Sequence, residues 1–374
     1  MNDTQKRTWA EIDLAVLEEN VKNMRAKLPG GCRFLGVVKA NAYGHGAVTV
    51  ARRLEAIGVE YLAVACLDEV RELRAAGITL PVLILGITPA EYAPELCALN
   101  ATQAVGSMEL ARGLNDALTG TDKKLKVHLK LETGMGRTGF RAWGADALGA
   151  AAEAVTLPHL DAEGIFTHFC VSDADAPLNA YTAEQFARFL GGIDNIERAS
   201  GKRFTIRHCT NSGAMLAFPE TYLDMVRPGV SLYGLYPGSE RQSVALHPAM
   251  ALYSRVAGVE EHHAGDTIGY GRTFTCDRDM RVAILPIGYA DGLHRSLSNK
   301  MEVWLGGKRC RQIGRICMDM CMVDVTDTEV KTGDVAEIFG KNIPIDELAD
   351  KAETIHYELC CAVAPRVPRV YKNV

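Results

Sequence analysis

The stretch that decides the fold is FLGVVKANAYGHG, residues 34–46. A short apolar and β-branched run leads to Lys39, and the residues after it include two glycines, a tyrosine and a histidine. This pattern is typical of a buried strand that leaves a sheet at a loop. A lysine at such a strand end predicts either a side chain that extends to water or a desolvated, neutral amine with a chemical role.

The same pattern recurs from residue 34 to about residue 235, because short apolar runs alternate with amphipathic segments of helical spacing. Eight such runs over roughly 200 residues match a (β/α)8 barrel, with an open doubly wound sheet as the alternative. The runs are FLGVVK, YLAVAC, PVLILG, TQAVG, LKVHLKL, EGIFTHF, FTIRHC and YLDMVRPGVSLYG.

Two helices are predicted in detail. In CLDEVRELRAAG, the side chains of Leu67, Val70 and Leu73 fall on one face, and Gly77 stands where a helix commonly ends. In SMELARGLNDAL, Ser107 is the expected N-cap.

After about residue 245 the sequence becomes rich in strands and turns. We therefore predict two domains, an α/β TIM-like barrel over residues 1–244 and a mainly β domain over residues 245–374. The segment RTWAEIDL near the start also has a strand pattern, and it is a candidate to pack with the β domain.

Composition excludes several classes of protein. The net charge is −5, from 41 basic and 46 acidic residues, and no basic run is long enough for a nucleic-acid footprint. No apolar stretch reaches the roughly 20 residues needed to cross a bilayer, so we expect a cytoplasmic protein. Eleven cysteines without a CxxC pair predict reduced thiols and no metal site.

In a barrel, chemistry is expected at the carboxyl ends of the strands. A neutral lysine at such an end is a nucleophile toward carbonyls, and pyridoxal phosphate (PLP) is the cofactor that uses one. The segments CTNSGAM and RPGV offer a hydroxyl and backbone donors for its phosphate. The other polar strand ends are Tyr43, Glu132, His168, His208 with Asn211 and Ser212, and Arg227 with Gly229.

The segment VVKANAYGHG resembles the cofactor-attachment signature of alanine racemases. The resemblance continues in order over nearly the whole chain, through HLKLETGMGRTGF, THF, TNS, RPGVSLYG, IGYG, LPIGYADG, GRICMDM and YELCCAVAPRVPRVY. It implies a PLP enzyme with a barrel and a β domain, acting as a head-to-tail homodimer. Its reaction would interconvert L- and D-alanine and supply D-alanine for peptidoglycan.

The resemblance also assigns catalytic roles. Lys39 would hold PLP and take the α-proton of D-alanine, and Tyr270 of the other subunit would act on L-alanine. Two bases are needed because a proton removed from one face must return from the other. His168 would bond this tyrosine, and Arg227 would donate to the pyridine nitrogen.

Further positions follow from the same resemblance. Arg137 and the backbone N–H of Met318 would bind the substrate carboxylate, with Tyr289 as a third substrate-binding candidate. Lys130 stands where some members of the family carry a carbamylated lysine, and Cys170 and Cys209 depart from the expected pattern. The phosphate would be held by Tyr43, Ser212, Gly229, Val230 and Tyr357.

Other functions remain open at this point. The GMGRTG segment, residues 134–139, matches the GxGxxG of a dinucleotide-binding dehydrogenase, but four strand-like runs precede it. A non-catalytic PLP-binding barrel would lack the β domain that bears Tyr270, and a related decarboxylase would place a carboxylate where Arg227 stands. A racemase of serine, lysine or a broad range of amino acids is nearer. Tyr357 favours a small side chain.

Overall fold

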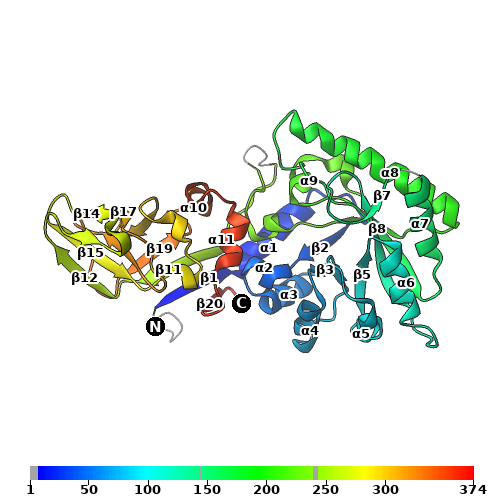
Figure 1. Cartoon of the computed structure of the whole chain (residues 1–374), viewed down its shortest axis with the longest axis horizontal. Coiled ribbons are helices and arrows are strands. Elements are labelled where there is room, and N and C mark those ends of the chain that lie inside the picture. Colours follow the sequence, from blue (N-terminus) through cyan, green and yellow to red (C-terminus); the bar gives the residue numbers. More distant parts are fainter. Residues whose placement is uncertain (1–6, 144, 239–242) are drawn as a thin grey trace. The chain divides into compact units, whose positions relative to one another are not determined.

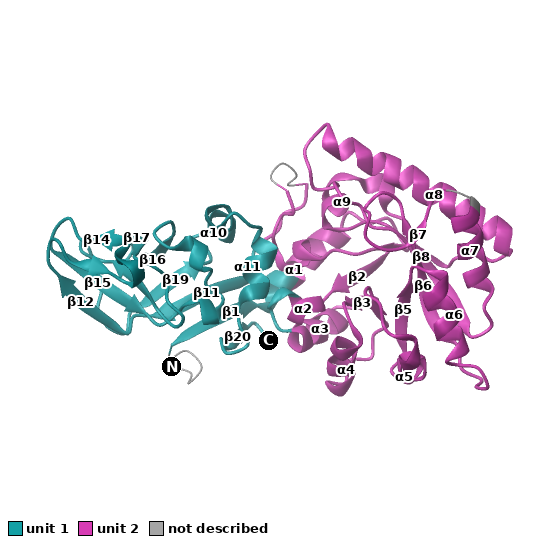
Figure 2. Cartoon of the chain, in the orientation of Figure 1, with its two compact units in different colours: residues 1–17, 43–46, 248–374 teal, residues 18–42, 47–247 magenta. Residues whose placement is uncertain are grey.

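The computed structural model describes residues 7–143, 145–238 and 243–374. The chain divides into two compact units, which Figure 2 colours separately. The barrel unit comprises Glu18–Ala42 and Ala47–His247. The β unit comprises Met1–Leu17, Tyr43–Gly46 and Pro248–Val374. The short segment Tyr43–Gly46 therefore belongs to a different unit from Lys39 and the strand before it.

The barrel unit is built on eight parallel strands in the order β10-β2-β3-β4-β5-β6-β8-β9 (Figure 1). Backbone hydrogen bonds from Asp224 to Arg207 (3.0 Å) and from Arg227 to Thr210 (2.9 Å) join the last two strands, so the barrel is nearly closed. Each predicted run forms one strand, which confirms the barrel. The strands are β2 (Arg33–Val37), β3 (Tyr61–Val64), β4 (Val82–Ile84), β5 (Ala101–Val105), β6 (Leu125–Glu132), β8 (Leu160–Phe166), β9 (Ile206–His208) and β10 (Met225–Val226), and β7 (Phe140–Arg141) pairs with β6.

Helices between the strands bury their apolar faces as the sequence predicts. In α4 (Leu67–Ala75), Leu67, Val70 and Leu73 are buried, and Ser107 Oγ accepts from the backbone N–H of Leu110 at the start of α6 (Met108–Asp116). No helix among the described residues is both long and apolar enough to cross a bilayer. The other helices here are α1 (Leu14–Arg25), α3 (Ala47–Ala56), α5 (Ala93–Ala98), α7 (Ala145–Thr156), α8 (Tyr181–Ser200) and α9 (Ser212–Ala217).

The β unit is a nine-stranded sheet in the order β12-β15-β18-β17-β16-β19-β11-β1-β20, with β13 (Thr267–Ile268) and β14 (Phe274–Thr275) forming a separate pair. The segment RTWAEIDL forms β1 (Thr8–Asp13), which pairs antiparallel with β11 and parallel with β20. The sheet strands are β11 (Met250–Arg255), β12 (Gly258–His262), β15 (Met280–Leu285), β16 (Glu302–Leu305), β17 (Lys308–Ile313), β18 (Cys321–Asp324), β19 (Val335–Phe339) and β20 (Arg369–Lys372); two helices, α10 (Ile345–Ala352) and α11 (His356–Ala362), accompany them.

Candidate active site

The turn that carries Lys39 has an unusual backbone. Strand β2 ends at Val37, and the helix-like turn α2 (Lys39–Tyr43) follows. Its residues 40–43, which are Ala, Asn, Ala and Tyr, all have φ between +52° and +54°. A left-handed conformation costs an L-residue roughly 1–2 kcal/mol. A run of four such residues therefore needs support from its surroundings, and strain of this kind concentrates at functional sites.

Side chains in the barrel unit give that support. Glu69 on α4 accepts from the backbone N–H of Ala40 and, through its other oxygen, from that of Ala65, both at 2.6 Å. The side-chain oxygen of Asn41 accepts from the backbone N–H of Ala47 at the start of α3 (2.8 Å). Sequence reasoning missed Glu69, because nothing in its helix distinguishes this carboxylate from its acidic neighbours.

Arg227 lies at the carboxyl end of the barrel and is only 4% exposed. Its guanidinium donates to the carbonyl of Thr167 (2.8 Å), to the carbonyl of Cys209 (3.3 Å) and to Nδ1 of His208 (2.9 Å). Burial lowers the pKa of Arg227 to about 10, so the group stays charged at neutral pH. Within the part of the chain that the structure describes, no carboxylate forms an ion pair with it, which leaves this cation suited to a ligand.

Two further basic groups beside Arg227 lose proton affinity. Burial and the charges of Arg137 and Arg227 lower the pKa of Lys130 to about 8, and its amine donates to Thr138 Oγ1 at 2.6 Å. Burial and the same two arginines hold the pKa of His168 well below its usual range. The Coulombic contributions of Lys39 to both groups place it in this cationic cluster. Such a field suits an anionic ligand.

The loop after β6 presents Arg137. Burial alone would raise the pKa of Glu132, but hydrogen bonds from backbone N–H groups of the loop outweigh it and lower the pKa. The donors include the backbone N–H groups of Gly134 and Met135 (2.5 Å each) and of Arg137 (3.1 Å). The GMGRTG segment is thus folded around one carboxylate and leaves the Arg137 side chain exposed.

A small polar cradle lies at the start of α9. Ser212 Oγ accepts from the backbone N–H groups of Gly229 (2.9 Å) and Ser231 (3.3 Å). Val230 begins the short helix that follows Gly229. The buried hydroxyl of Ser231 has no hydrogen-bond partner among the described residues. The hydroxyls of Ser212 and Ser231 together with a buried guanidinium are donors that fit a phosphate and a ring nitrogen, which are the acceptors that PLP carries.

The β unit holds the remaining predicted residues. The rings of Tyr43 and Tyr357 lie 6.2 Å apart, and burial raises the pKa of Tyr43. In contrast, Tyr270 is 71% exposed, Met318 53% and Tyr289 43%. The backbone N–H of Tyr289 donates to the carbonyl of Cys317 (3.1 Å), which brings the Tyr289 loop beside Met318.

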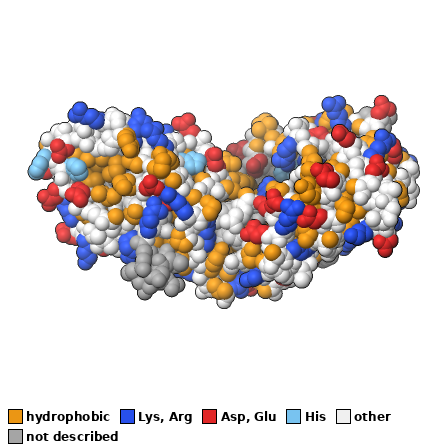
Figure 3. All heavy atoms as spheres, turned by 60° about the horizontal axis from the view of Figure 1, so that its bottom comes forward, with side chains coloured by type: hydrophobic (Ala, Val, Ile, Leu, Met, Phe, Trp, Pro, Cys, Tyr) orange, Lys and Arg blue, Asp and Glu red, His pale blue; other side chains and the backbone are white. Residues whose placement is uncertain are grey.

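Hydrophobic side chains gather on one face of the β unit (Figure 3). A hollow of about 400 Å³ in this unit is lined by Ile268, Tyr270, Ile284, Cys317 and Met322, among others. Tyr270 and the segment before Met318 thus border one apolar surface.

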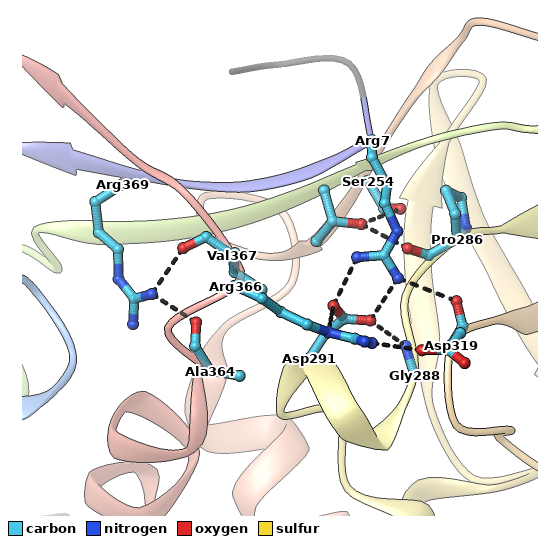
Figure 4. A network of polar contacts seen from close by, with 11 residues as sticks. Arg7, Ser254, Pro286, Gly288, Asp291, Asp319, Ala364, Arg366, Val367 and Arg369 are labelled. Carbon is cyan, nitrogen blue, oxygen red and sulfur yellow. Dashed lines mark hydrogen bonds and ion pairs between the residues drawn. The ribbon is translucent and has the colours of Figure 1, made fainter. Parts of the chain in front are cut away.

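A buried carboxylate ties the two exposed loops together (Figure 4). Asp291 is fully buried, and both its oxygens accept from Arg7, at 2.7 and 2.9 Å. It also accepts from Arg366 Nε (2.8 Å) and from the backbone N–H of Gly288 (2.9 Å), and Arg366 reaches Asp319 at 2.7 Å. Burial would raise the pKa of Asp291, but these donors outweigh it and lower the pKa.

The structure therefore gathers the predicted residues into two groups. Cys170 and Cys209, the two cysteines that depart from the family pattern, both belong to the barrel unit. The Cys170 Sγ lies 3.3 Å from the side-chain oxygen of Gln185, and Cys209 is fully buried. The barrel unit holds Lys39, Lys130, Arg137, His168, Ser212, Arg227, Gly229 and Val230, and the β unit holds Tyr43, Tyr270, Tyr289, Met318 and Tyr357.

Comparisons with known proteins identify the relatives of this chain. Residues 12–237 match the family model "Alanine racemase, N-terminal domain", and residues 249–371 match "Alanine racemase, C-terminal domain". The alanine racemase of Desulfovibrio desulfuricans is 45% identical over 97% of both chains, and that of Desulforamulus reducens is 44% identical over 97% of this chain and 98% of its own. The solved alanine racemase of Clostridium difficile 630 has a TM-score of 0.93 at 38% identity, covering 98% of this chain and 96% of that one. The chain belongs to the alanine racemase family.

Proposed function

We propose that this protein interconverts L-alanine and D-alanine with PLP as cofactor and with Lys39 and Tyr270 as its two bases. The observation that carries the proposal is made at the carboxyl end of the barrel. There Lys39 stands on an irregular turn, and the buried guanidinium of Arg227 has no carboxylate partner among the described residues. Full-length similarity to alanine racemases supports the same conclusion.

The residues present fit PLP. When bound through Lys39, PLP withdraws electrons from the α-carbon of an amino acid and so acidifies its α-hydrogen. Arg227 would donate to the ring nitrogen, and Ser212, Gly229 and Val230 would hold the phosphate, together with Tyr43 and Tyr357. An arginine keeps its own proton, so it would leave that nitrogen unprotonated.

The two bases would act on opposite faces of the substrate. The Lys39 amine would take the α-proton of D-alanine, and the Tyr270 hydroxyl would act on L-alanine. His168, whose pKa is lowered, would be the neutral partner of Tyr270. Arg137, the backbone N–H of Met318 and Tyr289 would orient the substrate carboxylate.

A head-to-tail homodimer is part of the proposal, with Tyr270 and Met318 supplied by the other subunit. Exposed large apolar side chains support it, since Tyr270, Tyr289, Met318 and Met320 are 43–71% exposed in the single chain. All eleven cysteines are free thiols, which fits the cytoplasm. There the product D-alanine would serve peptidoglycan synthesis.

We further propose that Lys130 is carbamylated. A pKa of about 8 leaves a useful fraction of neutral amine at neutral pH. Attack of that amine on CO2 forms an N–C bond and releases one proton, giving a carboxylate close to Arg137. A cavity of about 230 Å³ lined by Lys130 and Thr138 leaves room for the added group.

One assay tests the reaction and its main alternatives. The purified protein with PLP is incubated with L-alanine, L-serine and L-lysine separately, and the enantiomers are separated by chiral chromatography. We expect D-alanine to form fastest, because Tyr357 in the proposed substrate pocket would favour a small side chain. Faster turnover of serine or lysine would favour a racemase of another amino acid. No turnover of any of the three would favour a non-catalytic PLP-binding protein.

A further inference from the structure

A polar chain crosses the interior of the barrel below Arg227. The guanidinium lies 2.9 Å from His208 Nδ1, and His208 Nε2 lies 2.8 Å from His128 Nδ1. On its far side, His128 Nε2 lies 3.5 Å from Glu163 Oε1. Both imidazole rings are fully buried. None of the proposed catalytic steps uses His128 or Glu163, so the chain needs an explanation of its own.

Chemistry fixes the direction of the two hydrogen bonds in this chain, which join Arg227 to His208 and His208 to His128. Arg227 has only donors, so His208 Nδ1 must accept. Burial and the charge of Arg227 hold the pKa of His208 well below its usual range, so the ring is neutral and its one proton lies on Nε2. That proton is donated to His128 Nδ1. Burial also lowers the pKa of His128, so its own proton lies on Nε2. This atom faces Glu163 Oε1 at 3.5 Å and makes no hydrogen bond among the described residues, so the contact is electrostatic.

The carboxylate at the far end is ionised. Burial would raise the pKa of Glu163, but His128, Tyr61 and Lys126 outweigh it and lower the pKa to about 2. Tyr61 donates to Glu163 Oε1 at 2.8 Å, and the ammonium of Lys126 lies 3.3 Å from the other oxygen. The chain therefore links a buried cation to a carboxylate through two neutral rings whose dipoles point the same way.

An irregularity in the pairing of β6 with β8 makes room for this chain of side chains. Val127 pairs with Ala162 and His128 pairs with Gly164, so Glu163 is an extra residue in β8, at a bulge. Bulges are rare between parallel strands, and they redirect a side chain. A Cβ on Gly164 would lie 2.5 Å from His128 Cδ2. Only glycine leaves room for the His128 ring here.

We propose that His128 and Glu163 are positioning residues, which hold His208 as an acceptor toward Arg227 and compensate the buried charge of this arginine from inside the barrel. The ring of Phe166 stacks on His208 at 5.0 Å and lies under the guanidinium at 5.3 Å, which fixes both in one orientation. A buried cation without such compensation is costly. The consequence for catalysis rests on the proposed contact of Arg227 with the cofactor, whereas the chain itself does not.

The first test measures the tautomers directly in the full-length protein as isolated. Nitrogen-15 NMR of the labelled imidazoles, assigned by single substitution of each histidine, distinguishes Nδ1–H, Nε2–H and the imidazolium. We expect both His208 and His128 to be neutral and protonated on Nε2 at pH 7.5. An imidazolium or an Nδ1–H form at either position overturns the proposal, whatever the activity of the protein.

The second test replaces the carboxylate of Glu163 with a neutral amide of nearly the same shape. For Glu163→Gln we expect kcat for L-alanine to fall about tenfold with KM nearly unchanged, together with a shifted absorption maximum of the bound cofactor. Glu197→Gln is the matched control, because Glu197 is a buried carboxylate of the same unit that bonds Arg203 and the backbone of Phe204. Equal kcat and equal spectra for the two variants would refute the positioning role.

A third variant disturbs the chain without removing any polar group. Gly164→Ala pushes on the His128 ring, whereas Gly149→Ala adds a methyl group in α7 with nothing within 4 Å. We expect kcat to fall only for Gly164→Ala, measured below the unfolding temperature of both variants. Unchanged kcat with a displaced ring would contradict the proposal. A wild-type protein that racemises no alanine would instead refute the proposed function and leave the tautomer result valid.

Discussion

The two units hold their candidate residues in opposite ways. In the barrel unit, Arg227 and Ser212 are no more than 6% exposed, and each has defined polar partners. In the β unit, Tyr270 and Met318 are more than half exposed. The barrel thus presents an ordered cationic half-site, whereas the β unit presents its residues on an open surface. The difference fits the proposed function, in which the barrel would hold the cofactor and the exposed Tyr270 would act as the second base only in a dimer.

The largest effect should come from the barrel half. Replacing Lys39 with alanine removes both the proposed point of cofactor attachment and one base, so we expect racemase activity to fall by about 10⁴-fold or more. The absorption band of the covalently bound cofactor should disappear. The exposed Lys22→Ala on α1 is the control and should retain activity. A Lys39→Ala protein that still carried cofactor reducible by borohydride would contradict the assignment.

The second largest effect should come from Tyr270, on the exposed surface of the β unit. For Tyr270→Phe we expect a loss of about 10²- to 10⁴-fold, because one of two proton-transfer groups is removed. Solvent deuterium should then enter the α-carbon unequally from L- and D-alanine, as followed by NMR. Tyr92→Phe, an exposed tyrosine of the barrel unit, should behave as wild type. Equal exchange from both enantiomers at wild-type rates would exclude the two-base scheme.

A third change tests whether the buried carboxylate of Asp291 stabilises the exposed loops of the β unit. Asp291→Asn removes the charge that holds Arg7 and Arg366 beside the Tyr289 loop. We expect unfolding to become easier by about 2 kcal/mol and KM for alanine to rise about tenfold. Denaturant unfolding and steady-state kinetics measure the two effects. Asp327→Asn, which breaks an exposed ion pair with Arg278, should change stability by less than about 1 kcal/mol.

The sign of the pH dependence follows from the lowered pKa of Asp291. Its stabilisation is fully present above the ordinary carboxyl pKa of about 3.9 and is lost as pH falls through the lower value in the folded protein. The stability difference between wild type and Asp291→Asn should therefore shrink on acidification below that pH. A difference that stays constant down to pH 2 would show that charge is not the cause.

Sequence patterns predicted what depends on neighbours along the chain. Eight buried runs gave the barrel, and the alternation in RTWAEIDL gave a strand that joins the β sheet. The supports of the site were missed because their partners are distant in sequence. Glu69 lies 29 positions from the turn it holds, and Arg7 lies 284 positions from Asp291. The local sequence around either residue gives no signal that predicts such a contact.

The turn after Lys39 was missed for another reason. A strand end followed by a loop was predicted, whereas residues 40–43 are all left-handed although none of them is glycine. Propensity favours right-handed backbone for alanine and tyrosine, so only tertiary contacts such as that of Glu69 impose this shape. The candidate side chains were therefore predictable from motifs, while the backbone that presents them was not.

The smallest effect should come from Lys130, because its proposed carbamate would add one contact near Arg137 to a cationic group that is already in place. We expect removal of CO2 to lower activity about fivefold, since loss of one ordinary hydrogen bond costs about 1 kcal/mol. Added bicarbonate should restore it. Because the pKa is about 8, the neutral amine fraction rises between pH 7 and 8, so at constant dissolved CO2 more carbamate should form at the higher pH.

Labelled carbon dioxide can locate this modification independently of catalysis. With ¹³CO2, the wild-type protein should show a carbamate carbon resonance, and Lys130→Met should lack it because the thioether cannot react. The same variant should lose the response of activity to bicarbonate. A carbamate signal that persists in Lys130→Met would assign the modification to another amine. In that case the burial that lowers the pKa of Lys130 would serve only to hold a neutral donor against Thr138, and the ordered half-site would be complete without a carbamate.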